Sequence, residues 1–134
     1  LQAVPDTNVI VSALPSNGPS RKLLLLAASS QLRLVSSPEL MQELAKVLQR
    51  DFEYSEEMTQ NVLNALATNL TLIEPAFRLE IIKKDSTDNK LLECAKAAKA
   101  DYIASYDHHL LEIKQFENTK IATPEVLLKD IEKS

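Results

Sequence analysis

Short apolar runs and longer segments of helical periodicity alternate along this chain. The apolar runs predict buried strands at residues 3–4, 32–35, 71–73, 102–104 and 120–122. Between them, apolar residues recur at helical spacing, most clearly from residue 40 to residue 48. Strands separated by helices are typical of an α/β domain whose mostly parallel sheet is covered on both faces. Because no linker or repeat divides the chain, residues 1–134 are expected to form a single domain.

Local signals predict where the helices begin. Ser37 before Pro38 combines a favoured N-cap residue with a favoured first helical residue. Ser20 is expected to cap a helix that starts at Arg21, and Ser55 stands before two acidic residues that suit a helix N-terminus. Further helices are expected to begin near Val9, at Thr87-Asp88 and at Thr123-Pro124. Asp85 would cap or precede the second of these helices.

Composition narrows the function classes. The 134 residues include a single glycine, which excludes a P-loop and a glycine-rich dinucleotide fingerprint. Any phosphate must therefore be held by side chains or metal ions. The formal net charge of -4 argues against a broadly basic nucleic-acid surface. Cys94 is the only cysteine, which favours a cytoplasmic protein, and no apolar run is long enough to span a membrane.

Acidic residues follow two of the predicted strands. Asp6 follows the first strand and Asp107 follows the strand at 102–104, while Asp88 opens the helix before that strand. In a parallel α/β sheet, strand carboxyl ends and helix N-termini share one rim, and ligand sites lie there. These three carboxylates are therefore expected to meet at one edge of the sheet.

Glu43 is the fourth candidate, and its position follows from a helical wheel. An apolar face runs along the helix that contains it, and Glu43 lies roughly 100° from the centre of that face. It is therefore the acid of this helix best placed to point into a cleft beside the core. The alternative is a solvated residue at the edge of the helix.

Four segments, in this order and spacing, resemble the PIN-domain family. They are Asp6-Thr7-Asn8-Val9, Ser37 to Leu44, Asp88 to Ala95, and Ser105-Tyr106-Asp107. The resemblance covers nearly the whole chain. Within the family, the chain is similar to the branch of VapC-like toxin components of toxin–antitoxin systems. It implies a three-layer α/β/α sandwich with a mostly parallel sheet of about five strands.

The resemblance also implies an activity, that of a metal-dependent endoribonuclease. Asp6, Glu43, Asp88 and Asp107 correspond to the metal-binding and catalytic acids, with Asn8, Ser105 and His109 at supporting positions. Crowded carboxylates repel one another unless cations join them, and Mg²⁺ or Mn²⁺ prefers such oxygen ligands. The implied partners are an RNA substrate, an antitoxin protein and a second copy in a homodimer, with no membrane.

Three residues depart from the pattern of that family. Pro5 stands where an apolar strand residue usually precedes the first acid. Tyr106 replaces a glycine beside the fourth acid, which would narrow the entrance, and His109 replaces a further acid. His108 and His109 are otherwise expected to be exposed loop residues. These departures leave the number of bound metal ions open.

Other assignments compete with the nuclease hypothesis. One is a PIN-like module that binds RNA or protein with weak or no catalysis. Another is a phosphoryl-transfer domain with Asp6 as nucleophile, although one such fold expects an acid where the chain has Asn8. Lys90, like the set Arg21, Lys22 and Arg50, is either a phosphate contact or an ordinary surface base. Cys94, near apolar helix positions, is expected to be a core residue and not a nucleophile.

Overall fold

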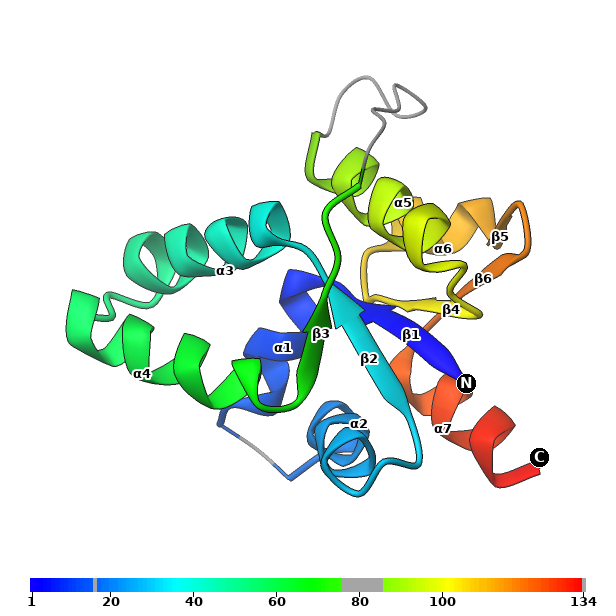
Figure 1. Cartoon of the computed structure of the whole chain (residues 1–134), viewed down its shortest axis with the longest axis horizontal. Helices are drawn as coiled ribbons and strands as arrows, with labels where there is room; N and C mark the ends of the chain where they lie inside the picture. Colours follow the sequence, from blue (N-terminus) through cyan, green and yellow to red (C-terminus); the bar gives the residue numbers. More distant parts are fainter. Residues whose placement is uncertain (16, 76–85, 134) are drawn as a thin grey trace.

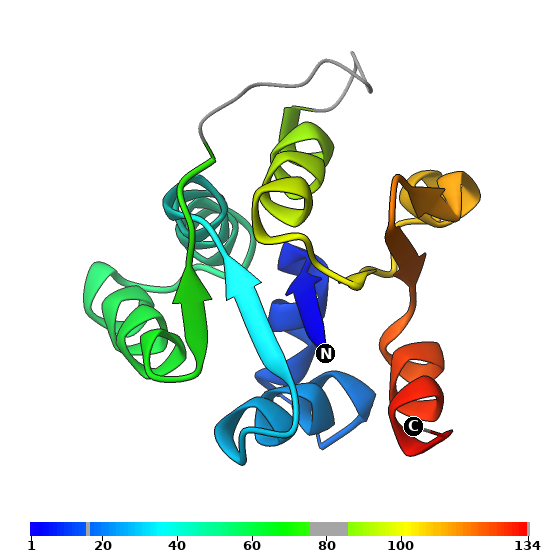
Figure 2. The same ribbon diagram turned by 45° about the vertical axis from the view of Figure 1, so that its right-hand side comes forward.

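A computed structural model of the chain, which describes residues 1–15, 17–75 and 86–133, contains a six-stranded sheet in the order β3-β2-β1-β4-β6-β5 (Figure 1). Five strands run parallel, and the two-residue β5 is antiparallel to β6 at one edge. Figure 2 shows the arrowheads of β1, β2 and β3 pointing the same way. The strands are β1 (Gln2–Pro5), β2 (Arg33–Ser36), β3 (Leu70–Leu72), β4 (Tyr102–Ala104), β5 (Gln115–Phe116) and β6 (Thr119–Ala122).

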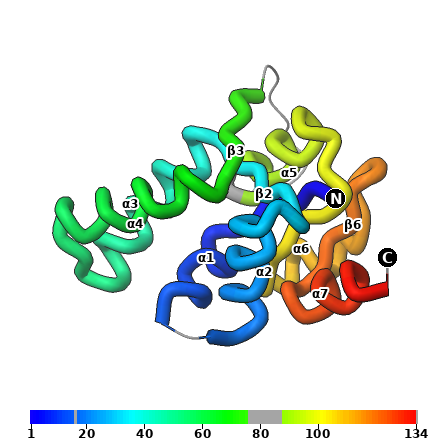
Figure 3. Tube along the Cα trace, turned by 60° about the horizontal axis from the view of Figure 1, so that its bottom comes forward, coloured from blue at the N-terminus to red at the C-terminus, as the bar shows by residue number. Residues whose placement is uncertain are grey.

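Helices cover both faces of this sheet, so the expected three-layer α/β/α architecture is confirmed. The helix pair α3 and α4 lies side by side and extends beyond β3 (Figures 1 and 3). Within the described ranges, no helix has both the length and the apolar character that a membrane crossing requires. The helices are α1 (Thr7–Ala13), α2 (Pro19–Ala28), α3 (Pro38–Asp51), α4 (Glu56–Ala67), α5 (Ser86–Ala98), α6 (His108–Ile113) and α7 (Pro124–Lys133).

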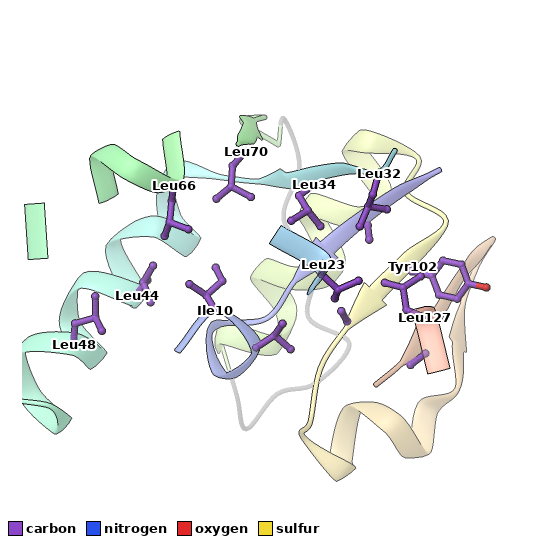
Figure 4. Packing of buried hydrophobic residues seen from close by; sticks show 14 residues of the cluster. Ile10, Leu23, Leu32, Leu34, Leu44, Leu48, Leu66, Leu70, Tyr102 and Leu127 are labelled. Atoms are coloured by element: carbon purple, nitrogen blue, oxygen red, sulfur yellow. The ribbon is translucent and has the colours of Figure 1, made fainter. Parts of the chain in front are cut away.

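Two cores form because successive strand residues point to opposite faces of the sheet. On one face, Leu34 of β2 packs with residues of α1, α2, α4 and α7, as Figure 4 shows for Ile10, Leu23 and Leu127. On the other face, the next residue, Val35, packs with residues of α5 and α6. Both faces of the sheet are therefore buried, which explains why its strands read as continuous apolar runs.

Helix starts follow the local signals at Ser37, at Ser55 and at Thr123-Pro124, where α7 begins, and depart from them at Ser20. Ser37 Oγ accepts a hydrogen bond from the backbone N–H of Leu40, and Ser55 Oγ accepts one from Met58. The expectation that Ser20 caps α2 is wrong. The helix begins at Pro19, whose fixed φ suits the first helical position, so Ser20 lies inside it.

The hydrophobic pattern does not predict the short helix α6 and the short strand β5, which follow β4. His108 and His109 are exposed as expected, but they begin α6 and do not lie in a loop. Six residues of helix and two of β5 are too few to show a period. Asp85, expected to cap or precede α5, lies outside the described residues.

Left-handed backbone positions are occupied by residues other than glycine. The single glycine, Gly18, has φ -76°, whereas Lys99 at the end of α5 has φ 54°. The backbone N–H of Ala100 there donates to the carbonyl of Ala95, which closes the end of the helix. A side chain with a Cβ is strained in this conformation, so Lys99 is held left-handed by the surrounding hydrogen bonds.

Replacing Lys99 with glycine is therefore expected to stabilise the fold. Lys99→Gly removes the Cβ strain and should raise the free energy of unfolding by about 0.5–1 kcal/mol in urea denaturation. The matched Lys96→Gly, inside the same helix, should lower it by about 1 kcal/mol. Equal effects of the two substitutions would show that the left-handed position carries no strain.

Candidate active site

The candidate site lies where the chain reverses its direction of travel across the sheet. From β1 the chain moves outward to β2 and β3, and α5 then returns it to β4 on the other side of β1. The backbone N–H of Asp6 donates to the carbonyl of Ala104 over 2.8 Å, so β1 and β4 remain paired up to their carboxyl ends. Such a switch point leaves a crevice beyond the strand ends, where open α/β sheets bind ligands.

A pocket of about 400 Å³ lies there, and all four predicted acids line it. Asp6 and Asp88 are buried, whereas Glu43 and Asp107 are half-buried. Asp6, Asp88 and Asp107 thus lie at the same edge of the sheet, as expected, and Glu43 reaches the same pocket from α3. Their carboxylates come from the end of β1, the middle of α3, the first turn of α5 and the loop after β4.

Asp6 is held by hydrogen bonds to both of its carboxylate oxygens. The backbone N–H of Thr7 donates to Oδ1 over 2.7 Å, and the hydroxyl of Ser105 donates to Oδ2 over 2.7 Å. Pro5, the last residue of β1, leads directly into this arrangement. Asp6 also caps α1, whose N-terminal dipole favours a negative charge. These contacts fix the carboxylate at the strand end.

The loop after β4 is tied to the loop after β1. Ser105 Oγ accepts the backbone N–H of Asp107 over 3.0 Å, while its hydroxyl donates to Asp6. Asn8 Oδ1 accepts the backbone N–H of Tyr106 over 3.2 Å. Two of the predicted supporting residues, Asn8 and Ser105, thus connect the segments that present two of the acids.

Glu43 and Asp88 are positioned by their helices. Leu40, Leu44 and Leu48 form the buried face of α3, which leaves Glu43 half-buried on its flank, as the helical wheel predicts. Asp88 lies in the first turn of α5, where a carboxylate is favoured by the helix dipole. Packing of α5 against β1 and α3 brings this turn to the pocket.

The other predicted supporting residue, His109, is not among the described residues that line the pocket. Its backbone N–H donates to Asp107 Oδ1, which caps α6. Tyr106 does not line the pocket either. Its hydroxyl donates to Glu125 Oε1 over 3.0 Å and lies 3.4 Å from Ser20 Oγ, so it bridges to α7 and α2. Burial raises the pKa of Tyr106, the Ser20 contact lowers it, and Glu125 raises it further.

Several other candidate groups are engaged elsewhere. Burial raises the pKa of the Cys94 thiol to about 12, so this residue is unsuited to act as a thiolate nucleophile. The guanidinium of Arg50 pairs with Asp51 over 2.9 Å, and that of Arg21 donates to the carbonyls of Ala13 and Leu14. Lys90 is half-buried in α5 and is not one of the described residues that line the pocket.

The donor chemistry of the pocket suits a hard divalent cation, because all four acidic groups offer carboxylate oxygens. Across the described ranges, however, no three His, Cys, Asp or Glu side chains converge closely enough to hold one metal ion together. The set therefore fits an ion bound by few direct carboxylates that keeps waters in its remaining positions, as Mg²⁺ commonly does.

Sequence reasoning missed the residues on the remaining wall of the pocket. Thr7, Val11 and Ser12 come from α1, while Val47 lies in α3 and Phe52 directly follows it. A signal was present for part of this set, because Val47 lies one helical turn after Glu43 and therefore on the same side of α3.

These features define an α/β domain with a carboxylate-lined pocket at the switch point of its sheet. The family model described as PIN domain matches residues 2–109, and the chain belongs to this family. The fold is similar to that of a chain in the crystal structure of VapBC2 from Rickettsia felis bound to a DNA fragment from their promoter. The TM-score is 0.63 at 17% identity, covering 90% of this chain and 97% of that chain. Comparison with curated protein sequences gives no significant match.

Removing the Ser105 hydroxyl tests how the pocket is held together. Ser105→Ala leaves the Asp6 carboxylate without one donor and the Asp107 N–H without its acceptor, both near the buried strand ends. The free energy of unfolding should fall by about 1–3 kcal/mol in urea denaturation. Ser29→Ala removes an exposed hydroxyl that donates to Leu26 and should change it by less than about 0.5 kcal/mol. Matching effects would contradict this assignment.

Proposed function

We propose that this PIN domain is a metal-dependent endoribonuclease that hydrolyses RNA phosphodiester bonds. The observation that carries the proposal is the shared pocket of Asp6, Glu43, Asp88 and Asp107 at the strand carboxyl ends. Membership of the PIN family, whose members are generally nucleases, supports the same class of reaction. The shortage of glycine agrees with it, because no glycine-rich loop is available to hold phosphate.

In this proposal the four acids would hold Mg²⁺ or Mn²⁺, with few of them bound to the ion directly and the others acting through its waters. A bound divalent ion lowers the pKa of a coordinated water and neutralises charge on the phosphodiester. The chain's own residues position the carboxylates: Ser105 and Thr7 orient Asp6, and the cap of α6 orients Asp107. In-line attack by water would break the P–O3′ bond and leave a 5′-phosphate and a 3′-hydroxyl.

The biological setting we propose is that of a cytoplasmic toxin neutralised by an antitoxin protein. Support comes from the fold shared with a chain of VapBC2 from Rickettsia felis, together with the sequence resemblance to VapC-like toxins. A homodimer belongs to the same proposal. Induced expression should arrest growth of a bacterial host, and co-expression of the protein encoded beside it should restore growth.

A PIN-like binding module with weak or no catalysis is the second candidate. Tyr106 and His109 replace the glycine and the acid expected there, and no three described acids, histidines or cysteines converge on one point. Calorimetric titration with Mn²⁺ separates the two proposals. Saturable binding that weakens in Asp88→Asn favours the nuclease, whereas no binding favours the module.

Asp88→Asn should abolish most of the divalent-dependent cleavage of single-stranded RNA. The substitution keeps the size of the side chain but removes a negative charge from the pocket. The rate should fall about 100-fold or more, because metal stabilisation of the reacting phosphate is worth several kcal/mol. Gel analysis of a labelled RNA with Mn²⁺ or Mg²⁺ measures this effect.

Asp101→Asn is the matched control, since Asp101 precedes β4 at the opposite end of the strand. Its carboxylate accepts the backbone N–H of Gln2 over 2.9 Å, a contact that asparagine can keep. The rate of this variant should stay near that of the unmodified protein. Cleavage that persists in excess chelator would refute the metal mechanism.

A further inference from the structure

The acid-lined pocket also has apolar lining residues, which metal binding does not use. Val11, Val47 and Phe52 line the same cavity as the four carboxylates. Phe52 is the notable member, because 51% of it is exposed although its side chain is a wholly apolar ring. Only three phenylalanines occur in the chain, and aromatic residues make up 4% of it. Among the large apolar side chains that the described residues leave exposed, Phe52 is the one that lines this pocket.

The end of α3 holds Phe52 at this position through backbone hydrogen bonds. Phe52 is the C-cap residue directly after α3, and the buried leucines of α3 anchor this helix to the core. The backbone N–H of Tyr54 donates to the carbonyl of Leu48 over 3.0 Å, which closes the helix end around Phe52. Glu53, directly after it, turns the chain with φ 56°. The ring is thus presented from a fixed support while its surface stays open to solvent.

Carboxylates and an aromatic ring in the lining of one pocket match the two parts of a nucleotide. A metal-bound phosphate suits the carboxylates, and a base, which has a flat π-face, suits an exposed aromatic ring. Only an unpaired base can leave its neighbours to stack on a protein side chain. With a net charge of -4, the chain is poorly suited to bind a long stretch of phosphates, so base contacts gain importance.

We propose that Val11, Val47 and Phe52 form a base subsite that takes one unpaired nucleobase next to the cleaved bond, with Phe52 as its stacking platform. The proposal rests on the nuclease function proposed above and narrows its substrate class to single-stranded or looped RNA. Phe52 acts here as a specificity-determining residue, and the bond cleavage itself remains the task of the carboxylate pocket.

Kinetics of Phe52 variants on a short single-stranded oligoribonucleotide test this subsite. Phe52→Ala should raise KM about tenfold with little change in kcat, because stacking holds substrate and transition state alike. Phe52→Leu, which keeps an apolar side chain without a ring, should recover only part of the loss, and Phe52→Trp should restore wild-type KM. Leu25→Ala changes a residue that is 62% exposed on α2 outside the pocket, and should leave KM unaltered.

An abasic substrate links the effect to the base. Removing the base next to the cleaved bond should raise KM for the wild-type protein by about the same factor as Phe52→Ala. It should add little further in that variant, since the two changes remove one contact. A wild-type KM for Phe52→Ala, or equal KM values for intact and abasic RNA, would overturn the base subsite and leave the nuclease assignment standing.

A binding measurement separates failure of the subsite from failure of the nuclease. In the Asp88→Asn background, where cleavage should be lost, a single-stranded RNA carrying 2-aminopurine should bind with quenched fluorescence. Adding Phe52→Ala should abolish the quenching, and a duplex of the same sequence should show none. If the wild-type protein cleaves no RNA, the proposed function fails, and this measurement decides the subsite. Binding that is independent of Phe52, or no binding, overturns it.

Discussion

The structure depends on how one buried carboxylate, that of Asp6, is held at the end of the central strand. A buried charge is costly unless polar groups surround it, and three other acids line the same pocket. The hydroxyl of Ser105 and the backbone N–H of Thr7 each donate to it over 2.7 Å. These two bonds join β1 to the loop after β4 and to the start of α1. The contact that orients the acid therefore also closes the switch point of the sheet.

The parallel sheet makes this arrangement possible. The strand order places β1 and β4 side by side at the centre of the sheet, and helices bury both of its faces. The carboxyl ends of these two strands therefore cannot move independently. The helices then bring Glu43 and Asp88 to the same pocket through the apolar contacts of α3 and α5 with the two cores. Mutual repulsion of the acids is thus opposed by the packing of two cores, and a cation would relieve it further.

The proposed function uses two kinds of residue that line the same pocket. The carboxylates are where we place the proposed metal-dependent hydrolysis, and membership of the PIN family supports a nuclease. The apolar residues, with Phe52 at the end of α3, offer a surface of the kind that unpaired bases use. The hydroxyl of Tyr106 donates to Glu125 and so connects the loop after β4 with α7.

Sequence alone determined the fold class and the parallel strands, because both depend on local signals. It also singled out the four acids that the structure brings to one pocket, and their role there stays a prediction. Apolar runs mark strands buried on both faces, Ser37 and Ser55 mark helix starts, and carboxylates after strands must share a rim. Only the tertiary structure decided the roles of Ser20 and Phe52. Ser20 carries the signal of a cap, yet Pro19 begins the helix and Ser20 instead faces Ser12 and Tyr106. Phe52 lines the pocket because α3 packs against α1 and α5. These contacts join segments that are distant in the sequence, and no periodicity in the chain predicts them.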